Sequence, residues 1–81
     1  MTRGEVFERV VAIMRMTFEA SDVEIHDRTT ATDVDGWDSL AHATLIVRIE
    51  KRFNVSVPDA VAYHASNVGE LVDGICAVVG Q

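Results

Sequence analysis

The sequence predicts an all-α fold: a small four-helix bundle with three main helices, a short third helix, and a long loop between helices one and two. Apolar residues recur at helical intervals in three segments, near residues 2–18, 39–53 and 68–79. The chain has 81 residues, 48% of them hydrophobic, and can bury one small core but not two. We therefore expect one domain over residues 1–81, with a stability of about 4 to 12 kcal/mol by per-residue scaling.

The first predicted helix begins with Thr2 and Glu5, whose spacing is that of a capping box. After this helix, the acid-rich stretch from Glu19 to Asp38 breaks the helical pattern and predicts a loop. A loop of this length inside a small domain is typical of a functional region. The apolar stripe of the helix consists of Val6, Phe7, Val10, Val11, Met14 and Phe18, and the expected core anchors of the loop are Val23, Ile25 and Val34.

The second helix is expected to begin at Ser39 and to end near Phe53. Gly36 permits backbone angles that other residues avoid, and Asp38 and Ser39 can both cap the free N–H groups of a first helical turn. His42 falls on or near the inward side, where a lone histidine is more often a half-buried core residue than a metal ligand. The inward stripe itself is formed by Leu45, Ile46, Ile49 and Phe53.

An extended stretch is expected after the second helix. Pro58 restricts Val57 to β-like angles, which excludes a helix at that point. Asp59 is available to cap a short third helix, which we expect over residues 60–64.

Capping residues at both ends predict the last helix. Ser66 and Asn67 are capping residues, Glu70 follows Asn67 by three positions, and Gly80 is a natural stop. Its apolar stripe is formed by Val68, Leu71, Val72, Ile75 and Val79. The lone Cys76 cannot form an internal disulfide and is expected to be a small buried hydrophobic residue.

The composition excludes several classes of partner. Seven Lys and Arg against thirteen Asp and Glu give a formal net charge of −6, so phosphate backbones and anionic lipid surfaces would repel the protein. We therefore expect neither nucleic acid nor a membrane as partner. No apolar run is long enough to cross a bilayer, and the start of the chain lacks the apolar stretch of a signal peptide, so a cytoplasmic location is expected.

Three site chemistries are disfavoured by the residue pattern. A calcium loop aligned on Gly36 would place Ala31 at the first ligand position and His42 at the final glutamate position. A serine hydrolase would need a base over Ser39, whereas His42 projects from the same helix toward the core, and Gly-x-Ser-x-Gly is absent. The isolated His26 and His64 complete no zinc pattern.

The segment Gly36-Trp37-Asp38-Ser39-Leu40 places a serine hydroxyl at the positive end of a helix dipole, which favours an attached phosphate. With the order of the helices, the long loop and Val57-Pro58-Asp59, it makes nearly the whole chain resemble an acyl carrier protein.

The resemblance implies that Ser39, flanked by Asp38 and Leu40, receives a covalent 4'-phosphopantetheine arm that holds acyl groups as thioesters. It implies a monomeric carrier, not an enzyme. The implied partners are a phosphopantetheinyl transferase and the enzymes that load and process the acyl group.

The chain departs from fatty-acid carriers in ways that concern pathway and docking. Basic residues surround the single Glu50 of the second helix, which weakens the usual acidic docking face, and Trp37 is more similar to free-standing carriers of specialised pathways. The resemblance therefore implies polyketide, fatty-acid-like or other specialised biosynthesis, with a peptidyl or aminoacyl carrier as an alternative. The expected partner-docking residues are Asp35, Leu40, Val47, Glu50 and Lys51.

A second alternative is a small helical protein-interaction domain with no covalent arm, in which Asp38 and Ser39 only cap a helix.

Overall fold

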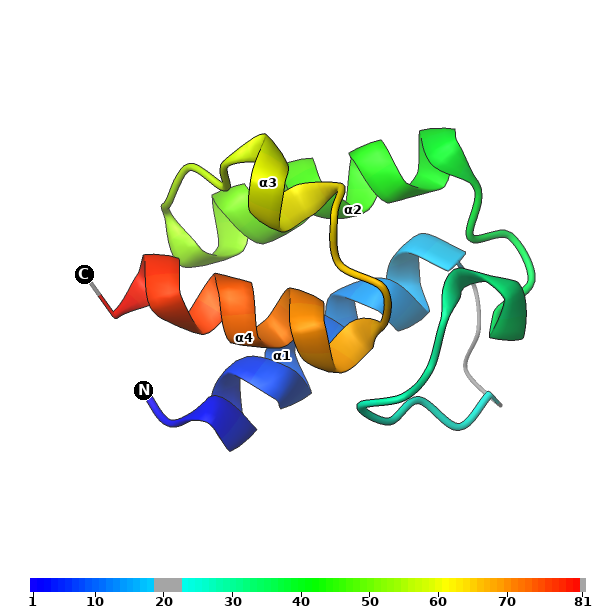
Figure 1. The fold of residues 1–81 in the computed structure, drawn as a ribbon, viewed down its shortest axis with the longest axis horizontal. Coiled ribbons are helices and arrows are strands. Elements are labelled where there is room, and N and C mark those ends of the chain that lie inside the picture. Colours follow the sequence, from blue (N-terminus) through cyan, green and yellow to red (C-terminus); the bar gives the residue numbers. More distant parts are fainter. Residues whose placement is uncertain (19–22, 81) are drawn as a thin grey trace.

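The computed structural model describes residues 1–18 and 23–80 and has four α-helices and no strand in this part of the chain. The helices are α1 (Arg3–Phe18), α2 (Ser39–Phe53), α3 (Asp59–Ala62) and α4 (Val68–Val79), with the short 3₁₀ helix η1 (Ala31–Asp33) before α2 (Figure 1). The all-α prediction is confirmed. The predicted bounds of the second helix are those observed for α2.

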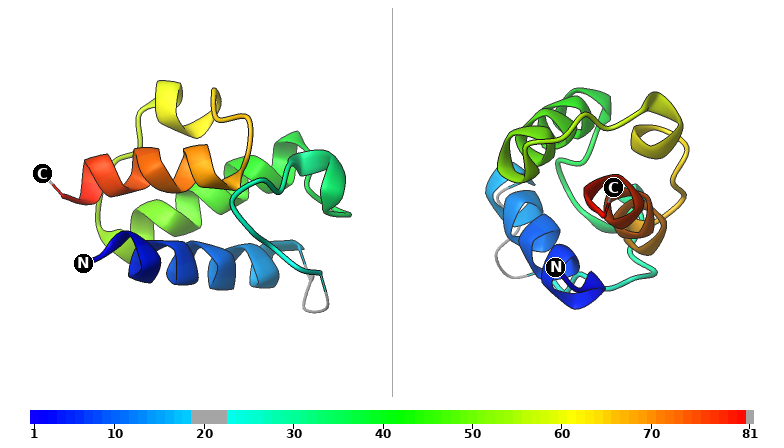
Figure 2. Two further views of the ribbon diagram at one scale, coloured as in Figure 1. Left: turned by 60° about the horizontal axis from the view of Figure 1, so that its bottom comes forward. Right: turned by 90° about the vertical axis from the view of Figure 1, so that its left-hand side faces the viewer.

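The three long helices lie side by side, with α1 packed against both α2 and α4, and α3 packed against α4 (Figure 2). The helix α1 runs in the opposite direction to α2 and α4, so α1 begins and α4 ends at one end of the bundle (Figure 1). The start of α2 lies at the other end, where the long loop also passes.

The core consists of the apolar sides of these helices together with parts of the loop. In α2, Leu45, Ile46 and Ile49 are buried as predicted, and Phe53 is half-buried against the same core. Ile13 joins the core although the sequence pattern did not select it. The largest fully buried side chains are those of Met14, Leu45, Ile49, Leu71 and Ile75.

The N-terminus of α1 forms the predicted capping box. The Thr2 N–H donates to Glu5 Oε1 at 3.0 Å, and the Glu5 N–H donates to Thr2 Oγ1 at 3.2 Å. The hydrogen bond from the Thr2 backbone N–H is the main reason that the pKa of the Glu5 carboxyl lies below its ordinary value.

The long loop is anchored by apolar residues and contains one element that the pattern did not predict. Ile25 and Val34 are buried as expected, and Val23 is half-buried against the core. The element η1 begins after Thr30, whose N–H donates to Asp33 Oδ2 at 2.9 Å. Residues 19–22 of the predicted loop lie outside the described part of the chain.

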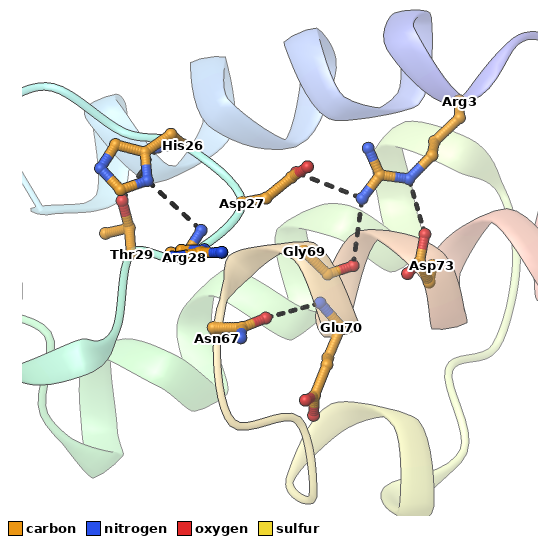
Figure 3. Close-up of polar contacts among 9 residues, drawn as sticks. All are labelled: Arg3, His26, Asp27, Arg28, Thr29, Asn67, Gly69, Glu70 and Asp73. Atoms are coloured by element: carbon orange, nitrogen blue, oxygen red, sulfur yellow. Dashed lines mark hydrogen bonds and ion pairs between the residues drawn. The ribbon is translucent and has the colours of Figure 1, made fainter.

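A polar cluster fastens this loop to α1 and α4 (Figure 3). Arg3 Nε lies 2.6 Å from Asp73 Oδ1, and Arg3 Nη2 lies 3.2 Å from Asp27 Oδ1. The hydrogen bond with Asp73 contributes most to raising the pKa of Arg3 above its ordinary value. The Gly69 N–H donates to the Asp27 carbonyl at 2.8 Å, and a Cβ at Gly69 would lie 3.0 Å from that oxygen, so this close approach favours glycine.

The structure corrects the prediction for the short third helix. The helix α3 spans Asp59–Ala62 instead of residues 60–64, and its N-cap is Pro58, not Asp59. The reason is that the Pro58 backbone is extended and its carbonyl accepts the Ala62 N–H at 2.9 Å, so the helix starts immediately after it. Asp59 therefore lies in the first turn.

The ends of α4 agree with the prediction. Asn67 is the N-cap, and its side chain accepts the Glu70 N–H at 2.9 Å, while Glu70 Oε1 accepts the Ser66 N–H at 2.9 Å. Gly80 is the C-cap. Cys76 is half-buried against the core, so its burial is less complete than expected.

Candidate functional site

The candidate site is the start of α2, where a sharp turn delivers the chain into the helix. Gly36 has a φ of 87°, a conformation that side-chained residues rarely adopt. Asp38 is extended and is the N-cap of α2, with its carboxylate accepting the Ala41 N–H at 2.8 Å. The Asp38 carbonyl also accepts the His42 N–H at 2.8 Å. The capping function at this helix start therefore belongs to Asp38.

Ser39 is the first helical residue and is exposed. Among the described residues, none forms a hydrogen bond with its hydroxyl group. This hydroxyl lies at the N-terminus of a 15-residue helix, where the dipole and the unpaired N–H groups favour a negatively charged substituent. Ser39 can thus carry a phosphate ester without disturbing the cap.

Aromatic side chains pack together at the turn that precedes Ser39. Trp37 is half-buried and stacks on Phe18, with ring centroids 5.2 Å apart, and on His42, with centroids 6.0 Å apart. Trp37 Nε1 donates to His42 Nδ1 at 3.0 Å. The turn before Ser39 is therefore held by the end of α1 and by the first turns of α2.

His42 connects α2 to the end of α3. Because the Trp37 indole can only donate, His42 Nδ1 is the acceptor, and its Nε2 carries the proton toward the Ala62 carbonyl oxygen. The His42 ring also meets Tyr63 edge to face, with centroids 5.4 Å apart. The prediction of a half-buried histidine with satisfied hydrogen bonds is confirmed.

A cleft of about 370 Å³ opens beside Ser39. Its walls include Trp37, Asp38, Ser39, His42, Tyr63 and Asn67. The sequence pattern does not place Tyr63 or Asn67 at the site, since they follow α3 and reach it only through the fold. The nearest sequence signal was the position of His42 about one helical turn after Ser39, which gives no information on the opposite wall.

The expected docking residues differ in their accessibility. Leu40 is 79% exposed and Val47 is 47% exposed on α2. Lys51 on the same helix and Asp35 in the preceding turn are also exposed. Glu50 is different, because it is half-buried and its Oε2 accepts the Val57 N–H at 2.8 Å. The Glu50 carboxylate thus fastens the segment that leads to α3.

Residues 1–18 and 23–80 contain neither a metal-holding group nor a membrane-spanning helix. No group of three or more His, Cys, Asp or Glu side chains there could hold a metal ion. No helix in these residues is both long enough and apolar enough to span a membrane.

Comparison with known proteins identifies the family. The family model described as the phosphopantetheine attachment site matches residues 8–75. The acyl carrier protein of Guillardia theta is 34% identical over 76 residues, which cover 93% of each chain. That of Phenylobacterium zucineum is 31% identical over 69 residues, covering 85% of this chain and 87% of the relative. No solved structure gives a significant match.

The mitochondrial acyl carrier protein of Saccharomyces cerevisiae is 30% identical over 82 aligned residues, which cover 95% of this chain. This chain spans only 65% of the length of that relative.

These matches cover most of the chain, and they agree with the small helical bundle. The protein belongs to the acyl carrier protein family, whose members have a phosphopantetheine attachment site. It is accordingly a carrier with covalently attached 4'-phosphopantetheine, and not an enzyme. Family members act with a phosphopantetheinyl transferase and with biosynthetic enzymes.

Proposed function

We propose that Ser39 is the attachment residue and that the protein carries an acyl or related intermediate on the arm. The observation that carries this proposal is that two neighbouring residues have different roles. Asp38 caps α2, whereas the exposed Ser39 hydroxyl has no hydrogen-bond partner among the described residues. A serine that served only as a cap would use its own oxygen for the first-turn N–H groups. The arm supplies a terminal thiol, which holds the cargo as a thioester.

The chain itself contributes position and orientation. The helix dipole of α2 stabilises the negative charge of a phosphate on Ser39, and Leu40 presents an exposed apolar side chain directly after it. Asp38 keeps the first turn intact while the hydroxyl is accessible to the transferase. The cleft between Ser39 and Tyr63 gives the base of the arm a partly apolar wall.

The test is arm transfer from coenzyme A by a phosphopantetheinyl transferase, followed by intact mass spectrometry. The wild-type protein should gain one arm, and Ser39→Ala should gain none while keeping its helical circular dichroism. Ser56→Ala is the matched control, because Ser56 is also exposed but lies after α2, and it should be modified like the wild type. Labelling of the Ser39→Ala variant would show that another residue is the attachment point.

The pathway is proposed as specialised biosynthesis, of polyketide or fatty-acid-like type. The supporting features are Trp37, which is held between Phe18 and His42, and the basic residues of α2 in place of an acidic face. A peptidyl or aminoacyl carrier would have the same arm. Mass spectrometry of the loaded protein isolated from its own cells separates these cargoes directly.

We further propose that the protein is a monomer, forms one domain over residues 1–81 and acts in the cytoplasm. The single hydrophobic core supports the proposal of one domain. Light scattering measures the mass in solution. Cell fractionation tests the location, which is of interest because the yeast relative is mitochondrial by name.

A further inference from the structure

The cleft beside Ser39 offers more space than a phosphate group occupies. Its volume of about 370 Å³ lies at the lower end of the range of about 300 to 1,000 Å³ that is usual for small-ligand pockets. Ser39 is part of one wall, and Tyr63, Ser66 and Asn67 belong to the segment that follows α3. The cleft can therefore hold a small ligand, or part of a longer one, next to the Ser39 hydroxyl.

Two polar groups on the wall opposite Ser39 are not used by the fold. Asn67 Oδ1 accepts the Glu70 N–H at 2.9 Å (Figure 3), which leaves the side-chain NH₂ group of Asn67 as a donor. Tyr63 meets the His42 ring by an edge contact and is 54% exposed. In residues 1–18 and 23–80, neither the Tyr63 hydroxyl nor the Asn67 NH₂ group has a hydrogen-bond partner. Both groups are thus available to a ligand in the cleft.

The walls of the cleft are held in place by contacts within the protein. His42 bonds both to Trp37 Nε1 and to the Ala62 carbonyl, so it ties the start of α2 to the end of α3. The helix α3 in turn lies close against α4 at Gly74, where a Cβ would be only 2.5 Å from Val61 Cγ1. A cleft that is already formed binds a ligand at a lower entropic cost than one that must be ordered.

The chemistry of the lining favours an uncharged ligand. Among the described residues that line the cleft there is no Lys or Arg, and Asp38 is the one acidic side chain. The Asp38 carboxylate already accepts the Ala41 N–H. Trp37 and Leu71 add apolar surface. An anionic ligand would find no cation here, whereas a chain with both apolar and hydrogen-bonding groups would match the lining.

We propose that the cleft is the resting site of the protein's own arm, with Tyr63 and Asn67 as its hydrogen-bonding residues and Trp37 as its apolar contact. This inference rests on the proposed attachment at Ser39. Because Ser39 is part of the cleft wall, the arm is tethered at the site that it would occupy. Beyond its phosphate the arm is an uncharged chain with methyl groups, a hydroxyl group and amides, which suits the lining.

The expected contacts are reversible. A short tether keeps the arm at a millimolar effective concentration beside the cleft, so weak contacts are sufficient for binding. One net hydrogen bond changes the ratio of docked to released arm about two- to tenfold. Bonds from Tyr63 and Asn67 together with the contact on Trp37 therefore favour the docked arm, and an enzyme that offers more contacts can still draw the arm out.

The experiment compares the amide NMR spectra of the unmodified protein and of the protein that has received the arm from coenzyme A. Ser66 and Leu71 are the reporters, because both line the cleft but lie far from Ser39 in the sequence. We expect attachment of the arm to displace the amide resonances of both reporters.

Two conservative variants test the hydrogen bonds. Tyr63→Phe keeps the ring that meets His42 but loses the hydroxyl, and Asn67→Asp keeps an N-cap oxygen for α4 but loses the NH₂ donor. Each variant should lower the ratio of docked to released arm about two- to tenfold, so attachment should displace the reporter resonances less than in the wild type. Ser56→Asp is the control, because it adds the same charge as Asn67→Asp at an exposed position outside the cleft, and it should behave like the wild type.

Displacements confined to residues next to Ser39 in the sequence would mean that the attached arm leaves the cleft empty, and would overturn the proposal. Equal reporter displacements in the wild type, Tyr63→Phe and Asn67→Asp would also overturn it, because neither side chain would then bind the arm. The proposed function fails differently: either the wild type itself gains no arm in mass spectrometry, or Ser39→Ala is still labelled.

Discussion

Replacing His42 with alanine should separate the first turn of α2 from the end of α3. The His42 imidazole accepts from Trp37 Nε1 and donates to the Ala62 carbonyl, so the substitution removes two hydrogen bonds at once. It also removes the ring that stacks on Trp37 and meets Tyr63 edge to face. His64 is exposed and follows α3, which makes His64→Ala a matched control.

The size of the effect follows from these contacts. Two hydrogen bonds contribute about 0.5 to 1.5 kcal/mol each, and two aromatic contacts add about 0.5 to 1.5 kcal/mol each, so the sum is about 2 to 6 kcal/mol. Because Trp37 and His42 are only half-buried, water can replace part of the lost bonding, and we expect the lower half of this range, about 2 to 4 kcal/mol. That is a large share of a total stability of about 4 to 12 kcal/mol.

Urea unfolding measures this loss with two probes. Trp37 is the single tryptophan of the chain, so its fluorescence reports the site, while circular dichroism reports the helices. His64→Ala should change the free energy of unfolding by less than about 0.5 kcal/mol. Glutamine can both accept and donate, so His42→Gln should recover part of the loss. If His42→Ala and His64→Ala unfold at the same urea concentration, the bridge to α3 is not formed.

Two further predictions concern the core and the cap of α1. Ile49→Ala should lower the free energy of unfolding by about 2 to 5 kcal/mol because Ile49 is fully buried, whereas Val47→Ala on the exposed side of α2 should lower it far less. Denaturant melts measure both losses. The reverse order would mean that the buried side of α2 is assigned wrongly. The lowered pKa of Glu5 means that its charged form favours folding, so this contribution is present above the ordinary value of 4.5 and is lost as the pH falls through the pKa of the folded state. Thermal melts should therefore show a stability difference between wild type and Glu5→Gln that shrinks on acidification, and a constant difference would contradict the capping box as its source.

The features predictable from the sequence were those that depend on many residues at once. The second helix was predicted with its observed bounds because its apolar stripe, Asp38 and the break after Phe53 all agree. The shorter elements depend on one or two hydrogen bonds. The start of α3 depends on the Pro58 carbonyl, and η1 depends on the side chain of Asp33, so neither had a repeated pattern to reveal it.

The candidate site was predictable only on one side. The motif around Ser39 was visible because its residues are contiguous, whereas the opposite wall of the cleft comes from residues after α3. The role of Glu50 was also hidden, since its bond to the Val57 N–H joins residues seven positions apart across a turn. The charge of Glu50 suggested a docking residue, and only the fold shows that its carboxylate is engaged.

Because Asp38 caps α2 and Ser39 does not, loss-of-function variants of the two residues are interpreted differently. Since the Asp38 carboxylate fastens the first turn of α2, a defect in an Asp38 variant combines a weakened helix start with any direct effect on the transferase. A defect in a Ser39 variant has no such second component. By reciprocity, a helix dipole that stabilises a phosphate on Ser39 is itself stabilised by that phosphate, so esterification favours the folded bundle. The modified protein would then resist proteolysis at least as well as the unmodified one, and a cell would lose no carrier to degradation by modifying it.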